Sequence, residues 1–393
     1  MIVHFKRFFK RFSTVSKKVG AILSRAGVIC EFNPFHNGHK FLLEKIKQEY
    51  TDEIVCIMSG NFVQRGDIAI ADKYLRTTAA LRYGADVVIE LPTPYALSSA
   101  RIFADNGVRI AAQMNCDILC FGAENSLEEL IEVAEQLEKE SVNDTIRSEM
   151  QSGQYYPKAL STALGAEHAE IVNQPNNILA LEYIKACRKY GIRPVAIPRK
   201  GVGHNEDAIR DGVASASKIR ELIQNGEPYQ LLTPMAITHM SCIKSIEPAI
   251  LYRLKTITAD ELAKIADVSE GLENRIINAA KQYNSMEEIY NAVKTKRYTM
   301  ARIRRIVINA FLGVTSELQN TPVPYLRVLG IGSGMEGLFQ SVKLPLVIKT
   351  RADCEKLDST AKEIFEIDLR AAEAMNLAGG QIINEFTKGI IKL

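Results

Sequence analysis

The sequence predicts an α/β fold, in which a doubly wound parallel sheet precedes a mainly helical C-terminal part. Two observations predict this fold class. Up to about residue 223, short apolar runs alternate with helical patterns, as in sheets whose parallel strands are buried on both faces. Beyond about residue 233 the alternation stops, and apolar residues recur at the three- and four-residue spacing of helices packed on a core.

Five apolar runs are the predicted strands of the sheet. They cover residues 28–30, 54–57, 87–89, 118–121 and 195–197. Helical patterns separate them, among them residues 73–83 and 98–114. Ligands of doubly wound sheets bind outside the carboxyl ends of the strands, where the strand order reverses. We therefore expect the functional site at that edge.

The C-terminal part is predicted to be helical. Its helical segments are residues 259–267, 270–283, 286–294 and 298–312. A chain of 393 residues exceeds what one compact core usually serves, so we expect two domains, residues 27–233 and 234–393. Residues 330–337 contain a GxGxxG pattern, but Pro345 follows too soon for the helix of a βαβ unit, so this pattern predicts a turn.

The first 26 residues form a basic segment that we expect to be a disordered extension. They contain seven Lys and Arg residues and no acidic residue. The net charge of the whole chain is +3, which leaves the remainder at −4. Local basic patches, and not the net charge of the whole protein, would therefore attract a nucleic-acid partner.

Composition is that of a globular protein of the cytoplasm. Hydrophobic residues make up 47% of the chain and charged residues 24%, and no apolar run approaches the length of a membrane span. The seven cysteines are scattered without a CxxC pair, so they predict neither a disulfide framework nor a zinc ribbon.

The most informative segment covers residues 27–39, where an apolar strand leads through Pro34 into a His-x-Gly-His motif. Pro34 ends the strand, Asn37 is the expected N-cap of the next helix, and Gly38 allows a phosphate to approach the backbone. Imidazoles one turn apart beside the first helical amides suit phosphate binding and charge stabilisation at an α-phosphate. The alternatives are a zinc-binding pair, which lacks a recognisable third ligand, and ordinary capping residues.

A second segment, residues 214–220, begins another amphipathic helix. Ser215 and Ser217 supply hydroxyls and Arg220 a cation one turn into the helix, a combination that suits the β- and γ-phosphates of a triphosphate. The alternative for this segment alone is a Ser N-cap followed by a solvated charged turn.

The two segments together resemble the signatures of the HxGH nucleotidyltransferase superfamily, with Ser217 where Thr is common. The resemblance narrows with the intervening blocks, which are similar to those of the bacterial tRNA(Met) cytidine acetate ligase family. These blocks are residues 59–67, 72–76, 84–92, 121–124 and 175–179. The resemblance implies that ATP activates acetate as acetyl-adenylate, with loss of pyrophosphate. The acetyl group then passes to the wobble cytidine of elongator tRNA(Met), giving acetylcytidine.

The resemblance also implies the site residues. The catalytic pair is His36 and His39. The implied ATP-binding residues are Ile29, Cys30, Glu31, Phe32, Asn33, Pro34, Phe35, His36, Asn37, Gly38, His39, Lys40, Phe41, Leu42, Gly122, Asn176, Arg199, Ser215, Ser217 and Arg220. ATP is then a substrate, with Mg²⁺ bridging its phosphates, and no protein-bound metal site is expected. No residue of the sequence is singled out as a general base.

A basic helix in the C-terminal part is the expected tRNA contact. Its cations are Lys296, Arg297, Arg302, Arg304 and Arg305. Apolar residues at helical spacing give this segment a buried stripe, which leaves the cations for tRNA phosphates or bases. The alternative is a solvated basic helix.

Other activities remain open from the residues themselves. One is an adenylyltransferase that moves AMP onto a small phosphorylated acceptor. Another is a non-catalytic RNA-binding module that retains the nucleotide pocket. A further polar cluster of Gln64, Arg65 and Lys73 suits acetate or tRNA, with a solvated loop as its alternative.

Overall fold

The computed structural model describes residues 25–198, 209, 212–269, 271–295, 298–379 and 381–393. Within these residues an eight-stranded sheet has the order β10-β8-β5-β2-β1-β6-β7, with β9 beside β8, and β3 and β4 form a separate hairpin. The strands are β1 (Arg25–Cys30), β2 (Glu53–Ser59), β3 (Phe62–Val63), β4 (Asp67–Ile68), β5 (Val87–Leu91), β6 (Ile118–Ala123), β7 (Arg193–Pro198), β8 (Leu326–Ile331), β9 (Leu346–Val347) and β10 (Ile391–Lys392).

The predicted doubly wound sheet is confirmed. Strands β5, β2, β1, β6 and β7 are mutually parallel, and each contains one of the predicted runs. The chain adds β2 and β5 on one side of β1 and then returns to add β6 and β7 on the other. The strand order therefore reverses between β1 and β6, and a ligand crevice is expected at their carboxyl ends.

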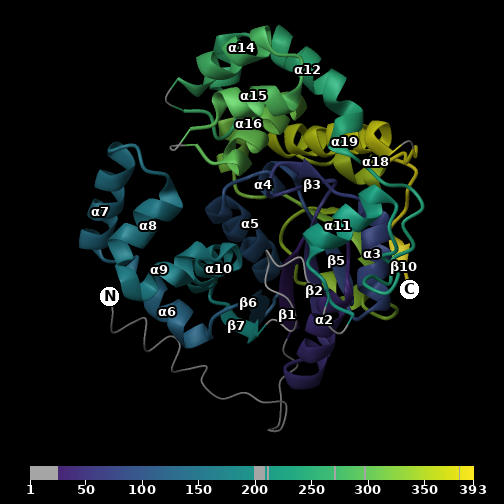
Figure 1. Cartoon of the computed structure of the whole chain (residues 1–393). Coiled ribbons are helices and arrows are strands. Elements are labelled where there is room, and N and C mark those ends of the chain that lie inside the picture. Colours follow the sequence, from purple (N-terminus) through teal and green to yellow (C-terminus); the bar gives the residue numbers. More distant parts are fainter. Residues whose placement is uncertain (1–24, 199–208, 210–211, 270, 296–297, 380) are drawn as a thin grey trace.

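Helices cover both faces of the sheet (Figure 1). Along β2, Val55 and Ile57 face the core that includes α5, whereas Cys56 and Met58 face the core that includes α2 and α3. This alternation is the pleat of a strand buried on both faces. The helices of this part are α2 (Asn37–Glu49), α3 (Lys73–Arg82), α4 (Thr93–Ala96), α5 (Ala100–Gln113), α6 (Leu127–Gln136), α7 (Glu140–Gln151), α8 (Tyr156–Leu164), α9 (Ala166–Asn173), α10 (Pro175–Tyr190) and α11 (Ala216–Asn225).

The C-terminal helices contribute to two cores: most of them build a second core, seen at the top of Figure 1, whereas Phe339 and Cys354 pack on the core of the sheet that includes α5. They are η1 (Ile243–Ile246), α12 (Glu247–Thr256), α13 (Ala259–Ala263), α14 (Leu272–Gln282), α15 (Met286–Val293), α16 (Met300–Leu312), α17 (Ser316–Asn320), η2 (Glu336–Phe339), α18 (Thr350–Cys354) and α19 (Ser359–Gly379). Each of the four helical segments predicted in this part contains one of these helices. None of the helices within the described ranges has the length and apolar character to cross a membrane.

The sheet crosses the predicted boundary between residues 233 and 234. Strand β8 pairs antiparallel with β5, and β9 and β10 lie parallel to β8. At Gly330 an added Cβ would lie 2.6 Å from the Thr77 Cγ2 on α3, so this glycine lets β8 pass under the helix. Only the short helix η2, and not an α-helix, begins at the end of the GxGxxG pattern, so the predicted turn is confirmed.

The start of β1 also differs from the expected boundary of the N-terminal extension. Arg25 and Ala26 belong to β1 and not to an extension that ends at residue 26. The Arg25 side chain makes a 2.9 Å ion pair with Glu53 on β2, and its amide donates to Asp117. Residues 1–24 lie outside the described part of the chain.

Four buried charges join the C-terminal tail to the sheet. Lys73 Nζ lies 2.9 Å from Glu90 Oε1 and 3.2 Å from Glu385 Oε2, and Arg327 pairs with both carboxylates. All four side chains are at most 5% exposed. Lys73 is therefore held by internal carboxylates, so of the polar cluster of Gln64, Arg65 and Lys73 this side chain does not lie at the surface, where a tRNA would reach it.

Candidate active site

The His-x-Gly-His segment lies at the carboxyl end of β1 and begins α2. His36 is the N-cap of this helix, and its Nδ1 accepts a hydrogen bond of 3.1 Å from the amide of Gly38. The Nδ1 of His39 accepts a hydrogen bond of 3.2 Å from the amide of His36. Each imidazole therefore satisfies a main-chain amide that the start of a helix would otherwise leave unpaired.

These two hydrogen bonds determine which ring nitrogen carries the proton. A ring nitrogen that accepts a hydrogen bond is unprotonated, so each imidazole is neutral and its proton lies on Nε2. The rings of His36 and His39 stack with centroids 3.7 Å apart and an interplanar angle of 25°. Phe32 packs edge-on against the His39 ring at 4.9 Å. The pair is thus a rigid source of two N–H donors, which phosphate oxygens can accept.

Asn37 is the first residue of α2 and not the predicted N-cap, because the His36 imidazole fills that role. Its side-chain amide donates hydrogen bonds of 2.8 Å to the carbonyl oxygens of Gly212 and Leu231. These carbonyls lie on either side of α11 in the chain. Asn37 therefore ties the start of α2 to the segment that carries the second motif.

The second motif begins α11 and is held against the first. Ser215 is the N-cap of α11, where its Oγ accepts a 3.1 Å hydrogen bond from the amide of Lys218. Arg220 donates 2.8 Å from Nη1 to the carbonyl oxygen of Asn33 and 3.1 Å from Nη2 to Ser217 Oγ. Burial lowers the pKa of the Arg220 guanidinium, whereas Asp67 and Glu31 raise it. The structure thus brings the imidazole pair and the second helix start together.

The predicted residues 29–42 differ in what their side chains do. Phe32, Asn33, Pro34 and Phe35 are buried, so the side chains of this turn shape the backbone around the site. Burial also raises the pKa of the Cys30 thiol well above its usual value. Ile29, Leu42 and Cys30 pack on the hydrophobic cores, while Phe41 is half-buried. Lys40 lies over the Tyr83 ring and 3.8 Å from Glu44.

Further along the same sheet edge, Gly122 ends β6 together with Ala123. The neighbouring Asn177 is fully buried, and its side-chain amide donates to Asn125 Oδ1 and to the Ile171 carbonyl. Asn176 is half-buried and donates 2.6 Å to Glu124 Oε1. Of the two asparagines, the predicted Asn176 is therefore the one with a side chain at the surface. Arg199 lies outside the described residues.

Two charged side chains help to hold this edge: Arg76, which sequence reasoning did not name as a site residue, and Glu31, which it named as an ATP-binding residue. Arg76 on α3 is fully buried, and its guanidinium donates to the carbonyls of Glu31 and Ser59, which ties the ends of β1 and β2 together. Glu31 Oε1 accepts a 2.7 Å hydrogen bond from the Gln64 amide. An arginine at helical spacing has no sequence signal that distinguishes this buried role from a surface one.

The arginines of the basic helix α16 differ in how far they are exposed to solvent. Arg305 is 8% exposed and its Nε donates 2.7 Å to Asp267 Oδ2. Arg302 donates to the Asp267 carbonyl and to Ser269 Oγ. Arg304 is exposed and lies over the Tyr290 ring at 5.9 Å. The geometry therefore favours Arg304 as a phosphate contact. Lys296 and Arg297 fall outside the described part of the chain.

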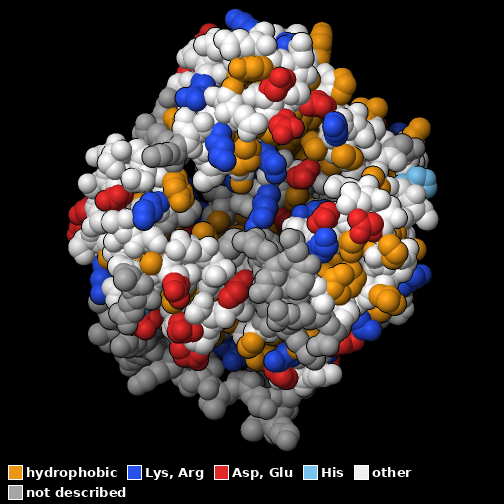
Figure 2. Space-filling view, viewed as in Figure 1, with side chains coloured by type: hydrophobic (Ala, Val, Ile, Leu, Met, Phe, Trp, Pro, Cys, Tyr) orange, Lys and Arg blue, Asp and Glu red, His pale blue; other side chains and the backbone are white. Residues whose placement is uncertain are grey.

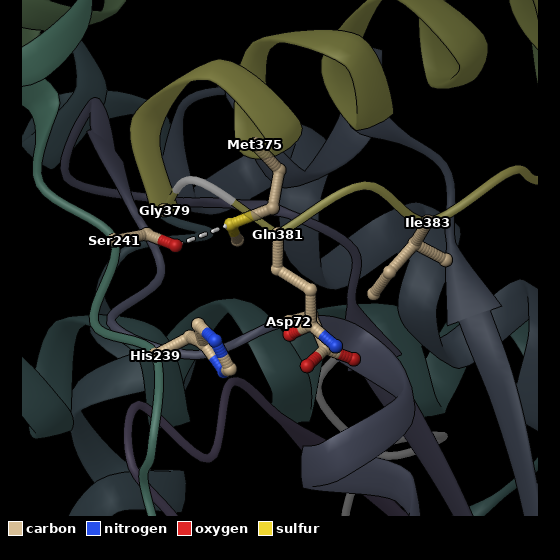
Figure 3. Close-up of a pocket in the computed structure, with 7 residues that line it drawn as sticks. All are labelled: Asp72, His239, Ser241, Met375, Gly379, Gln381 and Ile383. Atoms are coloured by element: carbon tan, nitrogen blue, oxygen red, sulfur yellow. Dashed lines mark hydrogen bonds between the residues drawn. The ribbon is translucent and has the colours of Figure 1, made fainter.

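Figure 2 shows Lys and Arg side chains gathered around a hollow near the middle of one face, below the C-terminal helices. A second, smaller hollow lies between the start of α3 and the end of α19 (Figure 3). Asp72 and His239 face each other across it, and Ser241 Oγ donates 2.8 Å to Met375 Sδ. Its interior admits about one water molecule, so it is not a nucleotide site.

The fold and the paired helix starts define a nucleotidyl transferase of the HIGH class, and the model of the family described as HIGH Nucleotidyl Transferase matches residues 23–387. A tRNA(Met) cytidine acetate ligase of Acetivibrio thermocellus is 35% identical over 93% of this chain and 99% of its own length. One from Staphylococcus carnosus is 32% identical over 94% and 98%. The chain belongs to the tRNA(Met) cytidine acetate ligase family, which confirms the resemblance.

Two crystal structures of Thermotoga maritima TmcAL have the same fold. The apo form matches with a TM-score of 0.83 and 28% identity, over 94% of this chain and 100% of that one. The form bound with alpha-thio ATP matches with a TM-score of 0.82 over the same shares.

Proposed function

We propose that this chain is an ATP-dependent ligase that activates acetate as acetyl-adenylate and transfers the acetyl group to the wobble cytidine of elongator tRNA(Met). Family membership supports the ligase activity and the tRNA partner, and the relative bound with alpha-thio ATP supports ATP binding. The observation that carries the proposal is the hydrogen bond from Arg220 to the Asn33 carbonyl, which holds both helix starts at the reversal of the strand order.

In the first step an acetate oxygen attacks the α-phosphate in line, and the bond from that phosphorus to pyrophosphate breaks. The Nε2–H groups of His36 and His39 donate to the oxygens on which negative charge grows. Ser217, Arg220 and the first amides of α11 hold the pyrophosphate, because a helix N-terminus and a guanidinium both favour phosphate. Positioning and electrostatic stabilisation are then the chain's contribution to the chemistry.

We further propose that Mg²⁺ takes part as the partner of ATP. Among the residues that the structure describes, no cluster of three or more His, Cys, Asp or Glu side chains could hold a metal ion. Mg²⁺ in nucleotide sites is commonly held by phosphate oxygens and water, which needs no such cluster. When bound, the ion supplies charge neutralisation on the triphosphate.

In the second step the exocyclic amine of cytidine attacks the acetyl carbonyl and AMP leaves. This step needs no covalent intermediate on the chain. Arg304 on α16 is the exposed cation best suited to guide the tRNA backbone, with the half-buried Arg302 beside it. Because tRNA is the acceptor, we assign the activity to the cytoplasm.

Exchange of labelled pyrophosphate into ATP, with and without acetate, tests the proposal. The ligase predicts exchange that depends on acetate and needs no tRNA. Exchange that requires a phosphorylated acceptor product instead would support an adenylyltransferase. ATP binding without any exchange would support a non-catalytic RNA-binding module. Either of these last two results would contradict the proposal.

A further inference from the structure

The hairpin of β3 and β4 physically joins the two halves of the proposed reaction. On one side, the Gln64 amide donates a 2.7 Å hydrogen bond to Glu31, which follows the last residue of β1 and lies five residues before His36. On the other side, Gly66 lies against α16, where an added Cβ would be 2.6 Å from the Arg305 backbone nitrogen. The φ of Gly66 is +75°, a conformation that glycine adopts readily, and the close approach of α16 leaves no room for a Cβ at this position. The edge of the sheet that carries the His-x-Gly-His motif and the basic helix α16 therefore both contact this hairpin.

Asp67, the first residue of β4, lies at this junction. Both Arg220, from the nucleotide motif, and Arg304, from the basic helix, act electrostatically on its carboxyl group. The Asp67 carboxyl in turn acts electrostatically on the Tyr290 hydroxyl on α15. One oxygen, Oδ1, accepts a 2.8 Å hydrogen bond from the Ile68 amide. The other oxygen, Oδ2, makes no hydrogen bond or ion pair with any residue that the structure describes, so one oxygen of a fixed carboxylate remains available to a substrate.

We propose that Asp67 is the general base of acetyl transfer, accepting the proton of the attacking cytidine amine on Oδ2; this rests on the proposed function. A general base must lie where the activated acetyl group meets the incoming cytidine. Arg220 belongs to the motif proposed to hold the nucleotide and Arg304 to the helix proposed to bind tRNA, and both act on Asp67. Burial raises the pKa of the Asp67 carboxyl, although the Ile68 amide and the two arginines lower it. A higher pKa makes a carboxylate a better proton acceptor.

The step balances without a further reactant. The cytidine nitrogen forms a bond to the acetyl carbonyl carbon, and the bond from that carbon to the AMP oxygen breaks. AMP leaves with the electron pair of that bond, and the proton from nitrogen passes to Asp67 and then to water. The products are acetylcytidine in tRNA, AMP and one proton.

Other groups at the edge are less suited to this role. Both imidazoles of the His36 and His39 pair accept main-chain hydrogen bonds at Nδ1 and carry their protons on Nε2, so they act as donors. The arginines that act electrostatically on Glu31 are Arg220, Arg65 and Arg76, and none of these three lies on the basic helix. Asp67, in contrast, interacts electrostatically with Arg220 of the nucleotide motif and with Arg304 of the basic helix.

The test uses Asp67→Asn in the full chain, because asparagine keeps an oxygen to accept the Ile68 amide. Acetate-dependent pyrophosphate exchange reports the first step, and this exchange should stay within about twofold of the unaltered protein. Acetyl transfer is then measured in a single turnover, by mixing the enzyme carrying acetyl-adenylate with saturating elongator tRNA(Met). This rate should fall by about 100-fold or more, the effect typical of losing a general base.

The pH profile separates a base from a residue that only supports the hairpin. In the unaltered protein the transfer rate should rise with pH as the Asp67 carboxyl loses its proton, and the variant should lack this rise. Asp144→Asn, a matched change at an exposed carboxylate on α7, should alter neither step.

Transfer by Asp67→Asn at the unaltered rate, or with the rise retained, would overturn the inference. An equal loss of exchange and transfer would also overturn it, since the carboxylate would then serve the nucleotide site. Failure of the proposed function is seen separately, as absence of acetate-dependent exchange in the unaltered protein.

Discussion

The guanidinium of Arg220 donates a 2.8 Å hydrogen bond to the main-chain carbonyl of Asn33, a residue 187 positions earlier in the chain. Its second terminal nitrogen donates to Ser217 Oγ on the same helix. One planar side chain thus fixes the start of α11 against the turn that leads into the imidazole pair. Arginine suits this role because its donors are arranged in a rigid fork.

Arg220→Lys tests that geometric role while keeping the charge. Lysine places a single ammonium where two directed donors are needed, so the two helix starts should lose their fixed separation. We expect the kcat/KM for ATP in acetate-dependent exchange to fall at least about tenfold, the loss of roughly one charge-assisted hydrogen bond. Arg147→Lys, on the exposed surface of α7, is the matched control and should leave exchange unchanged. Normal exchange by the Arg220 variant would contradict the role assigned to this side chain.

His39→Ala should stop adenylate formation without unfolding the protein. It removes one N–H donor at the α-phosphate, and such a donor is typically worth about 100-fold or more in rate. It also removes the hydrogen bond to the His36 amide, which should lower the free energy of unfolding by about 1 kcal/mol. Exchange assays and urea unfolding measure the two effects. A folded variant with ordinary exchange would show that the imidazole is only a helix cap.

Arg304→Ala should weaken tRNA binding and leave acetate-dependent exchange intact. Each lost phosphate contact lowers the slope of log affinity against log salt by about 1, so binding of elongator tRNA(Met) measured over a range of salt concentrations is the suitable assay. Affinity and slope equal to those of the unaltered protein would remove Arg304 from the tRNA surface.

Arg305→Ala, on the same helix, should act mainly on stability. Its removal leaves the Asp267 carboxylate without its ion-pair partner in a largely buried position. Breaking a pair of this kind costs about 3 kcal/mol, which urea unfolding would detect. If Arg305→Ala weakened tRNA binding with unchanged stability, the division between these neighbouring arginines would be wrong.

The buried charge cluster predicts that stability depends on pH through Glu385. Burial alone would raise the pKa of this carboxyl, but Lys73 and Arg327 outweigh it and lower the pKa to about 2. A carboxyl whose pKa is lower in the folded state stabilises the fold above its unfolded pKa, and this contribution is lost as pH falls towards 2.

Glu385→Gln should therefore reduce the free energy of unfolding by about 3 kcal/mol near pH 7 and by progressively less between about pH 5 and pH 2. Urea unfolding of both proteins across this range measures the difference. A difference that is constant with pH would mean that the charge of Glu385 does not provide the stabilisation.

Local patterns were sufficient to predict the parallel sheet and the two helix starts. Each buried strand is a short apolar run, and His36, His39, Ser215 and Arg220 lie in compact motifs whose chemistry is readable from neighbouring residues. The pairing of strands that are far apart in the sequence could not be predicted from such local patterns. Strand β8 joins β5 across more than two hundred residues, and no local signal states which edge it will join.

The roles of single charged residues were the hardest to predict. Arg305 and Arg304 are adjacent in sequence and equally basic, yet one is buried against Asp267 and the other is exposed. The difference arises because Asp267, on a loop 38 residues earlier, lies beneath only one of them. Lys73 and Asp67 are further cases in which the partners come from distant elements of the fold.

The most direct test of the proposed activity follows the acetyl group itself. The unaltered protein is incubated with ATP, isotopically labelled acetate and elongator tRNA(Met), and the nucleosides of the recovered tRNA are analysed by mass spectrometry. We predict labelled acetylcytidine at the wobble position, formed only when both ATP and acetate are present and lost in His39→Ala. Absence of label in tRNA, or label that arrives without ATP, would contradict the proposal.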